Sequence, residues 1–130
     1  MQPRRTEQEL IIEVLNALRS VTFDGKAVDA QYGWPQQWND LPIVTYSLAG
    51  ITDKDRDLNN LVVGYRLTYN IDIWCESPAD CLGLYVSIDD ALSGLGYTCL
   101  SQGTIYEDRS RHHMRVTADG YYDVVLDKVR

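Results

Sequence analysis

The feature that most constrains the fold is a long run of alternating residues over 61–75. Its odd positions are apolar: Leu61, Val63, Tyr65, Leu67, Tyr69, Ile71 and Ile73. Most even positions are polar, among them Arg66, Thr68, Asn70 and Asp72. Successive side chains of a strand point to opposite faces, so the run predicts a strand with one buried and one mostly solvated face. Such a strand would reach roughly 50 Å, far more than the usual 5–6 residues span.

A second alternating segment precedes this run and predicts its hairpin partner. Pro42 opens a strand over 42–49, in which Val44, Tyr46 and Leu48 alternate with Thr45 and Ser47. The charged stretch 50–57 between the two strands predicts a mobile loop. We expect the hairpin 42–75 to project beyond the body of the domain.

Two segments have the apolar spacing of helices. Thr6 and Glu9 are placed as in a capping box, and an amphipathic helix is expected over 6–20, closed by Asp24-Gly25. The second helix, 78–95, begins with Ser77 as cap and Pro78 at its first position. Residues 25–41 have no clear period and predict a connecting segment anchored by Trp34 and Trp38.

The last third of the chain predicts two more strands. The first covers 97–106 with a bulge at Gln102-Gly103, followed by a charged turn over 107–110. For the second, Asp119-Gly120 is a hairpin signal. However, the polar and apolar positions alternate over 111–127 without changing places at Gly120, which favours one long strand. The chain is then one α+β domain, 1–130, with the order α-β-β-α-β-β. Two helices would cover one face of a mainly antiparallel four-stranded sheet.

Charge and cysteine content exclude several classes of protein. The formal net charge of −7 argues against general nucleic-acid binding, which depends on neutralising phosphates. No apolar run approaches the roughly 20 residues that span a bilayer, and no signal-peptide core follows the N-terminus. The three cysteines, Cys75, Cys81 and Cys99, do not form a disulfide framework and are expected to be small buried hydrophobes.

No arrangement of reactive residues predicts catalysis, a metal or a cofactor. His112 and His113 are adjacent on a strand and would point to opposite faces. The acidic alternation over 53–57 lacks the glycine and glutamate of a calcium loop, because Leu58 and Gly64 occupy those positions. Nucleophile-elbow, phosphate-loop and zinc-protease motifs are also missing from the sequence. We therefore do not expect an enzyme.

Three groups of residues are candidates for an interface. The first is the charged loop, with Asp53, Lys54, Asp55, Arg56 and Asp57; the second is the basic patch of Arg109, Arg111 and Arg115; the third is the apolar pair Leu82 and Val86. The two charged groups are either solvated surface or complementary surfaces for a partner or a second copy of the chain. The apolar pair is either incidental exposure or a contact with a neighbouring subunit.

The element order and several strings resemble the tail-terminator (tail-completion) proteins of long-tailed bacteriophages. The strings are Leu41-Pro42-Ile43-Val44-Thr45-Tyr46, Tyr69-Asn70-Ile71-Asp72-Ile73-Trp74, the helix from Pro78 ending in Leu95-Gly96-Tyr97, and Arg115-Val116-Thr117. The resemblance covers nearly the whole chain and rests on strand pattern and element order.

The resemblance implies a structural virion protein that forms a hexameric ring. Such a ring caps the tail tube, ends its polymerisation and offers the surface for head-tail joining. Its expected partners are further copies of itself, the tail-tube protein and the head-tail connector protein, and DNA would pass through an acidic lumen without specific binding. The expected locations are the tail-neck junction of the virion and, during assembly, the host cytoplasm. Another neck, connector or assembly protein, or a small ligand-binding or enzymatic α+β domain, is the alternative.

Overall fold

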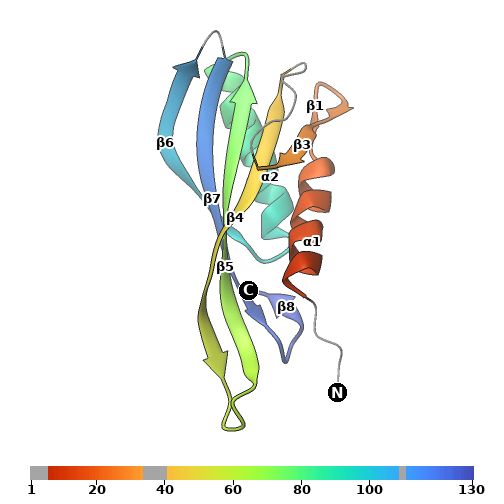
Figure 1. Ribbon diagram of the computed structural model, residues 1–130. Helices are drawn as coiled ribbons and strands as arrows, with labels where there is room; N and C mark the ends of the chain where they lie inside the picture. The colour runs from red at the N-terminus through yellow and green to blue at the C-terminus, as the bar shows by residue number, and fades with distance from the viewer. Residues whose placement is uncertain (1–5, 34–40, 109–110) are drawn as a thin grey trace.

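The computed structural model describes residues 6–33, 41–108 and 111–130, and at 53, 102–104, 106 and 108 it describes the backbone alone. Along the chain the elements are α1 (Glu7–Arg19), β1 (Thr22–Phe23), β2 (Lys26–Ala27), β3 (Asp29–Tyr32), β4 (Ile43–Arg56), β5 (Val62–Cys75), α2 (Pro78–Ser93), β6 (Thr98–Asp108), β7 (Arg111–Asp123) and β8 (Lys128–Val129). Both helices pack on one side of the main sheet (Figure 1). Trp34 and Trp38, the expected anchors, lie outside the described residues.

The prediction of a four-stranded, mainly antiparallel sheet is wrong. The main sheet has six strands in the order β3-β4-β5-β7-β6, with β8 paired to β7, and β1 and β2 form a separate two-stranded sheet. The sheet is mixed because β3 runs parallel to β4. The additional strands are two to four residues long. A period of two cannot be recognised over so few residues, so they left no pattern in the sequence.

The prediction that Asp24-Gly25 closes the first helix is also wrong. Helix α1 ends at Arg19 with Ser20 as its cap, and Asp24 and Gly25 form the turn between β1 and β2. Their φ angles are 52° and 77°. Two successive residues in this left-handed region are typical of the tight turn that joins hairpin strands.

Strands β4 and β5 form the long hairpin, whose far end projects beyond both helices (Figure 1). On β5 the odd-numbered side chains from Tyr65 to Ile73 are buried toward the helices, as the alternation predicts. The stretch 50–57 is not the predicted loop, since β4 continues to Arg56. Its pairing with β5 is shifted near Ala49 and between Thr52 and Asp55.

The two helices form where the capping residues predict them. The Thr6 side chain accepts a hydrogen bond from the Glu9 N–H at 3.1 Å, and the Ser77 side chain accepts one from the Asp80 N–H at 3.2 Å. Helix α2 ends at Ser93, two residues earlier than expected, with Gly94 as its cap. Helix α1 packs on α2, β3 and β4, and α2 packs on β5, β6 and β7. Their buried side chains are Leu10, Val14 and Leu18 of α1, and Cys81, Leu84, Ile88 and Leu92 of α2.

The choice between one strand and a hairpin at Asp119-Gly120 is settled in favour of one strand. Strand β7 runs through Gly120 without a break and pairs with β5 up to Asp123. Its predicted end at 127 is wrong, because the chain turns over 124–127 and returns as β8. Gly120 is required for packing: a Cβ there would lie 2.5 Å from Val129 Cγ1 and 2.6 Å from Tyr97 Cδ1.

This packing predicts a specific cost for adding one methyl group. Gly120→Ala should lower the free energy of unfolding by about 1–3 kcal/mol, because Tyr97 and Val129 must move. Gly83→Ala is the matched control, since a Cβ there meets nothing within 4 Å and alanine is the better helix former. Urea unfolding followed by circular dichroism measures both. Equal midpoints for the two variants would contradict the close packing at Gly120.

Candidate functional site

The face of the main sheet opposite the helices, here called the outer face, carries the polar side chains of β5 and β7. On this face Asp119 accepts hydrogen bonds from Arg66 Nη1 at 2.9 Å and from Thr68 Oγ1 at 3.2 Å. Asp72 lies directly opposite Arg115 in the register of the two strands. Cross-strand pairs of this kind hold the register of a sheet and neutralise charge locally.

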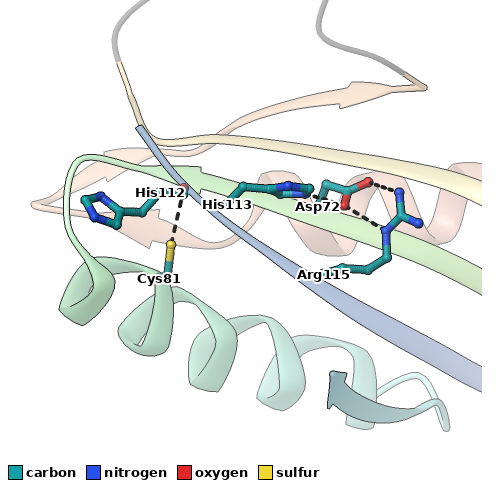
Figure 2. A network of polar contacts seen from close by, with 5 residues as sticks. All are labelled: Asp72, Cys81, His112, His113 and Arg115. Atoms are coloured by element: carbon teal, nitrogen blue, oxygen red, sulfur yellow. Dashed lines mark hydrogen bonds and ion pairs between the residues drawn. The ribbon is translucent and has the colours of Figure 1, made fainter. Parts of the chain in front are cut away.

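The outer face also carries a group of three ionisable side chains, here called the Asp72 cluster, formed by Asp72, His113 and Arg115. The Asp72 carboxylate lies 2.6 Å from His113 Nε2, and Arg115 donates to it through Nε at 3.0 Å and Nη2 at 3.3 Å (Figure 2). Asp72 is 8% exposed. The ring of Trp74 stacks on His113 with 3.8 Å between centroids and 6° between planes.

Electrostatics in the Asp72 cluster favour the charged carboxylate. Burial acts to raise the pKa of Asp72, but the hydrogen bonds from His113 and Arg115 and the Arg115 charge outweigh it, and the pKa is lowered. The same hydrogen bond raises the pKa of Arg115. Both carboxylate oxygens are bonded, so the geometry fits a cluster that joins β5 to β7 better than one that accepts a proton from a substrate.

The cluster was not predicted from the sequence. In the sequence His113 stands out only as the neighbour of His112, whereas its partner lies 41 positions earlier in the chain. Polar even positions on β5 and polar odd positions on β7 were visible in the sequence. Only the register of the two strands shows which of them meet.

Three residues of the charged loop, Asp55, Arg56 and Asp57, bond within their own hairpin or to the adjacent strand β7. Asp55 accepts a hydrogen bond from the Tyr121 hydroxyl at 2.6 Å, and this bond raises the pKa of Tyr121. Arg56 Nη1 donates to the Asn60 carbonyl at 2.9 Å. The Asp57 side chain accepts from the N–H groups of residues 59 and 61. Lys54 is exposed, and the side chain of Asp53 is outside the described part.

The described residues of the predicted basic patch, Arg111 and Arg115, lie on the half of β7 that is away from the charged loop (Figure 1). Arg115 belongs to the Asp72 cluster, so its charge is neutralised within the chain. Arg111 pairs with Asp108 in the β6–β7 register, and Arg109 is outside the described residues. The two groups are therefore not brought together within one chain and can meet only between copies.

The third candidate, Leu82 and Val86, lies one helical turn apart on the solvent side of α2. The two residues are 52% and 59% exposed. Other exposed apolar side chains occur at the hairpin turn, where Leu58 and Leu61 lie, and in the turn before β8, where Val125 and Leu126 lie. The last two are close to β5, because the Val124 N–H donates to the Val63 carbonyl at 2.9 Å.

The net negative charge is concentrated in the helix layer. Helices α1 and α2 hold six acidic side chains, Glu7, Glu9, Glu13, Asp80, Asp89 and Asp90, and one basic side chain, Arg19. They thus carry five of the seven excess negative charges of the chain. Strands β5 and β7 each hold equal numbers of Arg and Asp, so the outer face is balanced. Summing charge by predicted element would have revealed this asymmetry in the sequence.

Within residues 6–33, 41–108 and 111–130, no three His, Cys, Asp or Glu side chains gather as a metal site would require. Neither α1 nor α2 combines the length and apolar character that crossing a bilayer requires. Models of known protein families and the sequences of curated proteins give no match to this chain.

The Asp72 cluster predicts that part of the free energy of unfolding depends on pH in the acidic range. Asp72→Asn should lower the free energy of unfolding by about 2 kcal/mol at pH 7, because charge-assisted hydrogen bonds are lost. The folded-state pKa of Asp72 is lowered, so its contribution is present above the unfolded-state pKa and lost as pH falls through the folded-state value. Wild type should therefore lose more stability than Asp72→Asn between about pH 5 and pH 2.

Urea midpoints measured across this pH range test the assignment. Asp90→Asn, which removes an exposed carboxylate on α2, is the control for losing one negative charge. Parallel pH profiles for wild type and Asp72→Asn would show that the cluster contributes nothing specific.

Proposed function

We propose that this chain is a structural subunit of a phage tail-terminator ring, which caps the tail tube and provides the head-tail joining surface. The proposal rests on the resemblance of its element strings to that family. The structural observation that supports it most is the separation of charge into an acidic helix layer and a balanced outer face.

This separation of charge suits a passage for DNA. A wall that carries excess carboxylates repels phosphates, so DNA slides past it without being held. Repulsion of this kind acts over about 8 Å at physiological salt, which is effective inside a narrow channel. In the proposed ring the layer of α1 and α2 faces the lumen, and the outer face of the sheet does not.

The arrangement of exposed groups suits a ring closed by head-to-tail contacts. In such a ring, one surface of each subunit meets a different surface of the next. The hairpin end of the sheet, with the exposed Leu58 and Leu61, and the opposite end, where β7 begins, are two such different surfaces on one subunit. The proposed partners beyond the ring are the tail-tube protein and the head-tail connector protein.

Removing apolar surface at the hairpin turn should weaken the ring. The double variant Leu58→Ser, Leu61→Ser leaves the buried core intact, and we expect each subunit contact to weaken at least tenfold, which corresponds to about 1.4 kcal/mol. Asn59→Ser is the matched control in the same turn. Sedimentation velocity of the purified protein, alone and with tail tubes, measures the assembly.

A wild-type chain that stays monomeric and never associates with tail tubes would overturn the proposal. A ring that assembles but joins elsewhere in the neck would support the alternative, another connector or assembly protein. If the double variant and Asn59→Ser assemble equally, the hairpin turn is not part of a subunit contact.

Reversing charge on the helix layer should make the ring retain DNA. Asp89→Lys with Asp90→Lys changes the charge of each subunit by four near the C-terminus of α2, where cations are also favourable to the helix dipole. Glu76→Lys with Glu107→Lys makes the same change outside the helices. Electrophoretic mobility of linear DNA with assembled rings measures retention. Equal retention by both variants would contradict a lumen lined by the helix layer.

A further inference from the structure

Two buried cysteines meet where β5 passes into α2. Cys75 is the last residue of β5 and Cys81 is the fourth residue of α2. They are 1% and 0% exposed, and both belong to the main apolar core. Cys75 shares its parity with Ile71 and Ile73, whose side chains are buried toward the helices. Its thiol therefore points to the layer in which Cys81 lies.

The register of the sheet places the two thiols close to the same residue, His112. Cys75 is directly opposite His112 in the β5–β7 pairing, and Cys81 Sγ lies 3.6 Å from the His112 carbonyl oxygen (Figure 2). Residues directly opposite each other in antiparallel strands have Cα atoms about 4.5–5.5 Å apart. The Cys75 thiol in turn hydrogen-bonds to Cys81. The two sulfur atoms are therefore neighbours.

A small hollow reaches Cys75, the member of the pair that one small molecule can approach. It measures about 20 Å³ and is lined by Phe23, Leu41, Pro42, Cys75, Glu76 and Asp80. A space of this size holds about one water. Hydrogen peroxide exceeds water by a single oxygen atom, whereas a thiol reagent such as glutathione is far too large.

We infer that Cys75 and Cys81 form a dithiol site that hydrogen peroxide oxidises to an intramolecular disulfide. In the first step the sulfur of one cysteine attacks one peroxide oxygen, the O–O bond breaks, and water leaves as that cysteine becomes a sulfenic acid. In the second step the sulfur of the other cysteine attacks the sulfenic sulfur, the S–O bond breaks, and the proton of the attacking thiol leaves with the hydroxyl group as the second water. Two thiols are oxidised by two electrons, and one peroxide is reduced to two waters.

The two thiols have unequal surroundings. The hydrogen bond from Cys75 lowers the pKa of Cys81, and the same bond together with burial raises the pKa of Cys75. Cys81 therefore forms the thiolate more readily, whereas Cys75 is the thiol that lines the hollow. Cys99 is different: burial, aided by the Asp89 charge, raises its pKa to about 11. Cys99 provides an internal control.

Treatment of the full chain with hydrogen peroxide tests this site. After quenching and denaturation, intact mass spectrometry should show the loss of two hydrogen atoms in wild type and in Cys99→Ser. Cleavage after Glu76 by a glutamate-specific protease separates the two cysteines in the sequence. The resulting fragments should therefore remain joined until a reductant is added. The disulfide should also raise the melting temperature by roughly 5 °C relative to the reduced chain.

Cys75→Ser and Cys81→Ser should each lose the linkage. If either variant fails to fold, the joined fragments in Cys99→Ser decide the question, since that variant holds no other pair of cysteines. Oxidised wild type without joined fragments, or a linkage that disappears in Cys99→Ser, would overturn the inference. Addition of oxygen to single thiols with no loss of hydrogen would do the same.

Discussion

Strand β5 is the element on which the rest of the structure depends, because it pairs with β4 and with β7 along nearly its whole length. Its odd side chains supply the middle of the core beneath both helices, and its even side chains supply the centre of the outer face. A shift of its register by one residue would exchange these two sets and bury Arg66 and Asp72 beneath the helices. The cross-strand bonds of Asp72 and Asp119 stabilise the register that avoids this exchange.

The two faces of the sheet satisfy their polar groups in different ways. On the outer face, acidic and basic residues of β5 and β7 neutralise one another in contacts of about 3 Å. On the helix layer the carboxylates outnumber the single Arg19, and this layer therefore keeps the net charge. The proposed function uses both properties, since the acidic layer repels DNA and the balanced face can pack closely against other protein surfaces.

The sequence predicted the elements whose period extends over many residues and missed those that depend on distant partners. The alternation from Tyr65 to Ile73 and the caps at Thr6 and Ser77 were sufficient for β5 and both helices. Strand β3 has four residues and forms a strand because it pairs in parallel with β4. No local sequence pattern encodes that pairing. Likewise, the site at Asp72 requires a register between residues some 40 positions apart.

The short length of β3 has a consequence for how the chain avoids aggregation. Strand β3 pairs with β4 over Ile43–Tyr46, and the rest of β4 runs along the rim of the described sheet. An open strand rim offers unpaired N–H and C=O groups to any other extended chain. The register shifts near Ala49 and between Thr52 and Asp55 interrupt the regular spacing of those groups, and Lys54 adds a charge there. These irregularities protect the chain from uncontrolled strand addition.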